Sequence, residues 1–175
     1  MITDSGEHSL WLLPSRPDEK RLQELIQELS AEFGTPCFQP HLTLLGDVTL
    51  GRAKIKQGAR QALTNTAPIN AQVLEIGYLD EYFRSFFLRM NHQPALLALY
   101  ERSCQQLGVA PDSGFMPHIS LLYGPLQLAA KKALQMRLMP ALVRETICFD
   151  RVAVVRSAKS VPIHDWTVLD ILALQ

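Results

Sequence analysis

The chain has 175 residues, a length typical of a single domain. Hydrophobic residues make up 47% of it and charged residues 19%, which indicates an ordered globular protein rather than a disordered one. The 17 basic and 17 acidic side chains cancel, which argues against a large basic surface for a long nucleic acid. A small anionic ligand remains compatible with this balance, because it needs only a local positive site.

The same composition bears on the cellular setting. No apolar run approaches the roughly 18–20 residues that cross a bilayer, and the polar first residues do not resemble a secretory signal. We therefore expect a cytoplasmic monomer without membrane contact. Cys37, Cys104 and Cys148 form no C-x-x-C pair, which argues against a cysteine zinc site, although a bridge such as Cys104–Cys148 stays open.

An internal repeat organises the chain. Residues 40–46, PHLTLLG, recur as residues 117–124, PHISLLYG, and the two histidines are 118 − 41 = 77 residues apart. Thr43 in the first copy corresponds to Ser120 in the second, so a hydroxyl follows each histidine by two positions. The flanking segments repeat as well, which indicates a duplicated fold rather than a chance match.

In the first half, apolar spacing and punctuating residues predict five elements in order. They are a strand at 10–13, a helix from Ser15 and Pro17 to a left-handed stop at Gly34, the strand of the first motif, a weaker helix over 55–63, and an extended segment over 73–79 whose Leu74, Ile76 and Tyr78 share one side.

The second half predicts the same order, with one element added at the end. It contains a strand at 86–90, a helix from Pro94 to a stop at Gly108, the strand of the second motif, a weaker helix from Leu128 that ends near Pro140, a strand over 147–155 rich in β-branched residues, and the added strand over 166–174. The chain thus reads as two β-α-β-α-β units plus one strand.

The two units are expected to form one body. No linker rich in glycine or serine separates them, and the join falls near residues 80–82. We expect a single domain over 1–175, with a first lobe at about 9–80 and a second at about 81–175, or with terminal strands exchanged between the lobes. Pseudo-twofold symmetry would then bring the two motifs together.

Each motif presents polar groups on an apolar strand. Side chains at i and i+2 share a face, so His41 lies beside Thr43, and His118 beside Ser120. Leaving such groups buried and unpaired costs about 1–3 kcal/mol each, so a shared cleft is the favoured interpretation. A neutral imidazole can deprotonate water, a protonated one can protonate a leaving oxygen, and hydroxyls can bind phosphoryl oxygens.

The paired motifs resemble the two H-x-[T/S]-x motifs of the 2H phosphoesterase superfamily, and the whole chain resembles its cyclic phosphodiesterase-like branch. This resemblance implies an α+β fold in which two antiparallel sheets face a central groove. It also implies metal-independent, cofactor-free hydrolysis of a small cyclic nucleotide, either a nucleoside 2′,3′-cyclic phosphate or ADP-ribose 1″,2″-cyclic phosphate.

Carried onto this chain, the resemblance makes His41 and His118 the acid–base pair, and Thr43 and Ser120 the phosphate binders. We expect His118 to activate water and His41 to protonate the leaving oxygen, although the sequence does not fix this order. Two aromatic residues are added as substrate-binding candidates, Tyr123 at the end of the second motif and Trp11 as a stacking surface for a base. The remaining histidines, His8, His92 and His164, lack the motif and are expected to be structural or exposed.

Three alternatives remain open at the level of sequence. The same fold could process RNA ends as a 2′-5′ ligase or phosphodiesterase, which the neutral charge disfavours. It could also be a non-catalytic nucleotide- or RNA-binding module, although both histidines are present. A metal site built on the two histidines would lack carboxylate ligands within the motifs.

Overall fold

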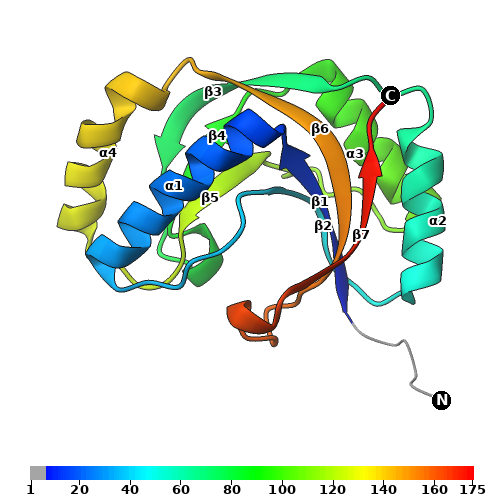
Figure 1. Cartoon of the computed structure of the whole chain (residues 1–175), viewed down its shortest axis with the longest axis horizontal. Helices are drawn as coiled ribbons and strands as arrows, with labels where there is room; N and C mark the ends of the chain where they lie inside the picture. Colours follow the sequence, from blue (N-terminus) through cyan, green and yellow to red (C-terminus); the bar gives the residue numbers. More distant parts are fainter. Residues whose placement is uncertain (1–6) are drawn as a thin grey trace.

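The computed structural model describes residues 7–175, and its elements follow the order predicted from the repeat (Figure 1). The strands are β1 (His8–Pro14), β2 (Leu42–Val48), β3 (Ile69–Gly77), β4 (Phe86–Met90), β5 (His118–Leu122), β6 (Thr146–Arg156) and β7 (Thr167–Ala173). The helices are α1 (Arg16–Phe33), α2 (Arg52–Leu63), α3 (Pro94–Leu107), α4 (Leu128–Leu142) and the short 3₁₀ helices η1 (Tyr82–Arg84) and η2 (Ile163–Asp165). Each half supplies β-α-β-α-β, and β7 follows.

Within residues 7–175 the strands form one seven-stranded antiparallel sheet in the order β1-β2-β5-β4-β3-β6-β7. The long strand β6 also pairs with β1, so its first part lies beside β3 and its second part between β1 and β7. The third strand of each half therefore pairs with the first strand of the other half. The α+β class and the antiparallel pairing are as expected, but the two sheets that the resemblance implies are joined into one.

The two motifs meet where β2 and β5 touch. These strands share a single ladder pair, Leu42 with Ile119, and these residues are 119 − 42 = 77 positions apart. Pairing of equivalent residues is what a local twofold relation requires, so the repeat in the sequence is also a repeat in space. Leu42, Leu44, Ile119 and Leu121 are buried in the core, as their alternation predicts.

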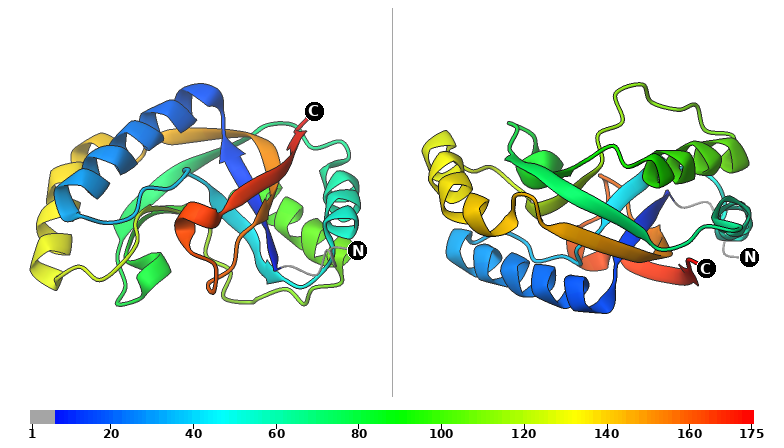
Figure 2. Two further views of the ribbon diagram at one scale, coloured as in Figure 1. Left: turned by 60° about the horizontal axis from the view of Figure 1, so that its bottom comes forward. Right: turned by 90° about the horizontal axis from the view of Figure 1, so that it is seen from above.

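The helices cover the sheet in two pairs. Figures 1 and 2 show α1 and α4 together at one end of the molecule and α2 and α3 at the other. An ion pair between Arg137 and Glu32, 2.6 Å long, joins α4 to α1. Gly58 of α2 lies so close to Leu107 of α3 that a Cβ would collide with the leucine side chain, so the absence of a side chain permits this close packing.

Helix ends follow their sequence signals. Gly34 and Gly108 both adopt φ of 65° directly after α1 and α3, as expected for left-handed stops. The α4 helix ends at Leu142, two residues after Pro140 and thus near the predicted end. Proline has no N–H to donate to the preceding turn. Because Pro140 lies in the last turn of α4, only that turn loses a hydrogen bond.

The alternation expected for residues 73–79 is wrong in one place. Leu74 does not share a buried side with Ile76: it is 47% exposed, whereas Val73 and Ile76 are both buried. The register of β3 against β4 shifts between Val73 and Glu75, and such an irregularity breaks the period of two. The strand also begins at Ile69, four residues earlier than predicted.

Two further sequence expectations can be compared with the described residues. No helix among residues 7–175 is both long and apolar enough to span a membrane. All three cysteines carry free thiols, so the bridge left open between Cys104 and Cys148 is not present.

Candidate active site

A cavity of about 800 Å³ lies between the two halves of the molecule. Its lining comes from β1, β2, η1 and β5, and from the segments before β5 and between β6 and β7. The structure brings all six predicted site residues to this cavity: Trp11, His41, Thr43, His118, Ser120 and Tyr123.

The two histidines are held in the same way. Nδ1 of His41 lies 2.7 Å from the carbonyl oxygen of Gln39, and Nδ1 of His118 lies 2.8 Å from that of Met116. A carbonyl can only accept, so each Nδ1 carries a proton and donates it. Nε2 of each ring is therefore the nitrogen available to a molecule in the cavity, as a base when the ring is neutral and as an acid when it is protonated.

Burial keeps His41 neutral in the free protein. The ring is almost fully enclosed, and burial lowers the pKa of His41 to about 4. The bond to the Gln39 carbonyl opposes this shift, and the nearby charge of His118 adds to it.

His118 is more open to solvent than His41 and has charged neighbours. Burial lowers the pKa of His118, and the Met116 carbonyl opposes the shift. Arg84 lowers the pKa further by charge repulsion, whereas Glu81 raises it. Both imidazoles therefore have a lower proton affinity in the free protein than in water.

The two hydroxyls differ in their surroundings. Within residues 7–175, the half-buried Thr43 hydroxyl has no hydrogen-bond partner and lines the cavity, so it can bind a ligand directly. Ser120 is buried and donates to the carbonyl oxygen of Phe83 over 3.1 Å. Tyr123 is hydrogen-bonded to Ser120, while burial raises the pKa of the Tyr123 phenol. The Ser120 proton is therefore already engaged, and Ser120 must release the Phe83 carbonyl before it can donate to a ligand.

Trp11 packs flat against His41. Their ring centroids are 3.6 Å apart and their planes differ by 9°. Trp11 is only 4% exposed and also packs against the β6 residues Ala153 and Val155. One face of the indole is thus covered by His41, so Trp11 offers little surface for the base stacking expected from the sequence.

Phe87 is the counterpart of Trp11 in the second half. Phe87 pairs with Ser120 across β4 and β5, as Trp11 pairs with Thr43 across β1 and β2. The Phe87 ring meets His118 edge to face, with centroids 5.2 Å apart and planes at 63°. An aromatic ring from the adjacent strand thus supports each histidine.

Trp166 is a cavity residue that the sequence analysis missed as a site residue. Its ring centroid lies 5.7 Å from that of Trp11 and 6.3 Å from that of His41. Its centroid also lies 5.9 Å from those of Phe83, whose plane differs by 25°, and Tyr123, which it meets edge to face. Trp166 lies between η2 and β7, outside the repeat, so no equivalent position in the first half could have indicated it.

Charged side chains also line the cavity. Arg84 and Glu81 form an ion pair of 2.7 Å in and beside η1, and Lys159, Asp47 and Asp112 lie elsewhere along the lining. Among residues 7–175, no group of three or more His, Cys, Asp or Glu side chains is arranged to hold a metal ion. The cations Arg84 and Lys159 thus line the cavity together with three carboxylates, and Arg84 is paired with one of them.

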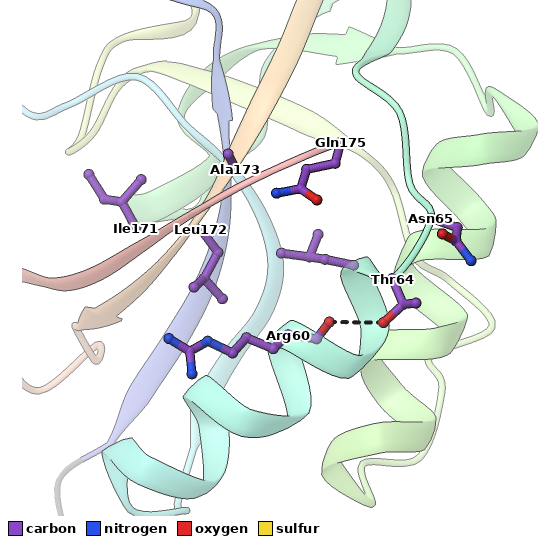
Figure 3. A pocket seen from close by; sticks show the side chains of 8 residues that line it. Arg60, Thr64, Asn65, Ile171, Leu172, Ala173 and Gln175 are labelled. Atoms are coloured by element: carbon purple, nitrogen blue, oxygen red, sulfur yellow. Dashed lines mark hydrogen bonds between the residues drawn. The ribbon is translucent and has the colours of Figure 1, made fainter.

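The other histidines and a second cavity lie apart from this arrangement. His8 is buried and bonded through Nδ1 to the Leu50 carbonyl, while His92 and His164 are exposed, as expected. A smaller cavity of about 420 Å³ lies between the end of α2 and β7, beside Arg60, Thr64 and Gln175 (Figure 3). None of the predicted site residues lines it.

Comparison with known protein families identifies the family of this chain. The family model described as "Cyclic phosphodiesterase-like protein" matches residues 7–174, which is nearly the whole chain. The chain belongs to the cyclic phosphodiesterase-like protein family. The resemblance to the cyclic phosphodiesterase-like branch is thereby confirmed, and the protein is a phosphodiesterase.

Individual relatives agree with this family assignment. The chain is 28% identical over 128 residues to a cyclic phosphodiesterase from Arabidopsis thaliana, covering 73% of this chain and 71% of that protein. The crystal structure of E. coli LigT complexed with phosphate is similar, with a TM-score of 0.60 and 14% identity, covering 97% of each chain. LigT complexed with 3′-AMP gives a TM-score of 0.59 at 16% identity, covering 97% of this chain and 98% of that one. At these identities the LigT structures support the fold alone.

Proposed function

We propose that this cyclic phosphodiesterase-like protein hydrolyses small cyclic phosphates to phosphomonoesters by acid–base catalysis between His41 and His118, without a metal ion. The substrate would be a nucleoside 2′,3′-cyclic phosphate or ADP-ribose 1″,2″-cyclic phosphate. The observation that carries the proposal is the matched hydrogen bonding of the two rings. Each Nδ1 donates to its own chain, which leaves both Nε2 atoms for one cavity.

The proposed reaction is a single displacement at phosphorus. The neutral Nε2 takes a proton from water as the water oxygen bonds to phosphorus, and the protonated Nε2 gives its proton to the ester oxygen as the P–O bond breaks. Thr43 donates to a non-bridging oxygen, and Ser120 does so after releasing the Phe83 carbonyl.

The order of the two histidines depends on proton uptake. We propose that His118 activates the water and His41 protonates the leaving oxygen. Because burial lowers the pKa of His41 to about 4 in the free protein, His41 must gain a proton when the anionic phosphate binds. The negative charge of the substrate supplies the physical reason for that gain.

One assay tests the reaction. Incubation with 2′,3′-cyclic nucleotides and with ADP-ribose 1″,2″-cyclic phosphate should yield phosphomonoesters, detected by phosphorus NMR, at equal rates with and without EDTA. The bond that opens, giving a 2′- or 3′-phosphate, identifies the leaving oxygen. Binding without hydrolysis of any cyclic phosphate would contradict the proposal and favour a binding module, and loss of activity in EDTA would contradict the metal-independent step.

We also propose that Trp166, rather than Trp11, stacks on the substrate base. Trp166 stays half-buried at the cavity, and its Nε1 donates to the Val161 carbonyl over 3.1 Å, which fixes the ring. Stacking on an aromatic side chain contributes roughly 1–3 kcal/mol. Trp166→Ala should therefore raise KM by on the order of tenfold and change kcat by less than about twofold.

The matched variant is Trp11→Phe, which keeps an aromatic ring beside His41. It should lower kcat more than it raises KM, because Trp11 contacts the imidazole rather than a base. Steady-state kinetics on one cyclic nucleotide separate the two effects. An unchanged KM in Trp166→Ala would show that Trp166 is not the stacking surface.

A further inference from the structure

The carbonyl group that orients His41 belongs to a residue whose side chain is itself held. Gln39 Nε2 donates to Glu19 Oε1 over 2.7 Å, while the Gln39 carbonyl accepts from His41 Nδ1. The other carboxylate oxygen, Glu19 Oε2, accepts from Arg151 Nη2 over 2.9 Å. Arg151 is therefore connected through Glu19 and Gln39 to His41. Arg151, Glu19 and Gln39 themselves do not line the cavity.

The carboxylate and the guanidinium at the base of this connection are mostly buried. The side chains of Glu19 and Arg151 are 13% and 11% exposed. Arg151 Nε also donates to Asp150 over 2.8 Å, and its Nη2 donates to the carbonyl of Pro14. A buried charge pair with several directed hydrogen bonds has few alternative arrangements, so Glu19 presents a fixed acceptor to Gln39.

The α1 helix holds the same segment at a second point. Gln23, one helical turn after Glu19 and on the same face of α1, donates from Nε2 to the Phe38 carbonyl over 3.0 Å. Phe38 in turn stacks on Tyr123, with ring centroids 3.8 Å apart. The two residues that precede Pro40 and His41 are thus fixed from the helix, not only by the sheet.

The second half lacks this arrangement. His118 Nδ1 donates to the carbonyl oxygen of Met116. Met116 is the residue equivalent to Gln39, because 116 − 39 = 77. A methionine side chain has no N–H to donate to a carboxylate. We propose that Glu19, Gln39 and Arg151 are positioning residues that fix the orientation and tautomer of His41 and leave His118 unaffected.

This inference rests on the proposed role of His41 in proton transfer. A transferred proton needs its donor and acceptor within hydrogen-bond distance, and a displacement of about 1 Å can lower a rate by up to about 100-fold. Loosening residue 39 should therefore lower kcat. It should change KM little, because Gln39 lies outside the cavity.

The test uses Gln39→Ala, Glu19→Ala and Glu19→Gln in the full chain. Gln39→Ala should lower kcat about tenfold with KM within about twofold, in line with a partial displacement of the imidazole. Nitrogen-15 NMR of the histidine rings should show His41 losing its single Nδ1–H tautomer while His118 keeps its own. Glu19→Gln still offers an oxygen to Gln39, so it should retain more activity than Glu19→Ala.

A matched control is Glu32→Ala, which removes another carboxylate of α1. Glu32 pairs with Arg137 of α4 and has no hydrogen bond to Gln39 or Arg151. This variant should leave kcat and the His41 spectrum as in the parent. Gln39→Ala with parental kcat and His41 spectrum, or with a lower Tm only, would overturn the inference. The NMR result needs no turnover, so it decides the positioning role even if the parent protein hydrolyses no cyclic phosphate.

Discussion

Substituting His41→Asn or His118→Asn is expected to lower kcat by about 10²–10⁴-fold, the range that general acid–base catalysis supplies. Asparagine is the informative replacement because its amide nitrogen takes the place of Nδ1. It can still donate to the carbonyl of Gln39 or Met116, while Nε2 is lost. The fold around the site is thereby kept and only the proton-transferring atom is removed.

The chain supplies its own control for this substitution. His8 is also buried, and its Nδ1 lies 2.9 Å from the Leu50 carbonyl, but it does not line the cavity. His8→Asn should therefore keep parental kcat while making the same chemical change. Because two residues that act in one step lose their effect together, the double variant His41→Asn with His118→Asn should be little worse than the poorer single variant. Parental turnover in either single variant would show that the paired mechanism is wrong.

Much of the fold could be predicted because the repeat contains the sequence signals of each element twice, once in each half. The stops at Gly34 and Gly108, the strand pairs and the helix order each occur twice, so a weak signal in one half is supported by the other. The repeat also located His41, Thr43, His118 and Ser120, since only a pair of motifs makes a histidine and a hydroxyl noteworthy on an apolar strand.

The parts that the sequence did not reveal depend on three-dimensional packing. The apolar alternation predicts that Leu74 is buried, but the register shift in β3 turns it outward. A one-residue shift in strand pairing cannot be recognised from the types of residue in the segment. Trp166 reaches the cavity from the segment between η2 and β7, where no repeat exists to compare. The stacking of Trp11 on His41 likewise depends on the pairing of β1 with β2.

The asymmetry between the halves is the other feature hidden in the sequence. The aligned motifs suggest two equal half-sites, yet His41 is enclosed and held by a charged cluster, whereas His118 is partly open and faces Arg84 and Glu81. Duplication supplies two imidazoles, and different neighbours give them different proton affinities. Acid–base catalysis uses a pair in which one ring is protonated while the other is neutral, and unequal proton affinities decide which ring holds the proton in the free protein.

The pH dependence of kcat/KM should report this directly, with a maximum below pH 6.5. In the free protein, burial lowers the pKa of His41 to about 4 and also lowers the pKa of His118 from its ordinary value near 6.5. The reactive form carries one proton on the pair, and its population is greatest between the two pKa values. Both values lie below 6.5, so the maximum does too.

The number of protons on the histidine pair also explains why kcat/KM falls on both sides of the maximum. As pH rises above the higher pKa, the pair loses its proton, and kcat/KM should fall about tenfold per pH unit. As pH falls below the lower pKa, both rings are protonated, the base is lost and kcat/KM falls again. The two singly protonated arrangements have the same pH dependence, so the profile does not depend on which histidine is the acid.

Arg84→Gln provides the variant that moves this profile in a known direction. The charge of Arg84 lowers the pKa of His118, and Arg84 also pairs with Glu81, which raises it. Removing Arg84 eliminates the first effect and releases Glu81 to act more strongly, so the pKa of His118 should rise and the alkaline limb should move to higher pH. Initial rates at low substrate concentration between pH 4 and 9 measure this limb in both proteins. An unchanged limb in Arg84→Gln, or a parental maximum above pH 7, would show that these two imidazoles do not control the reaction.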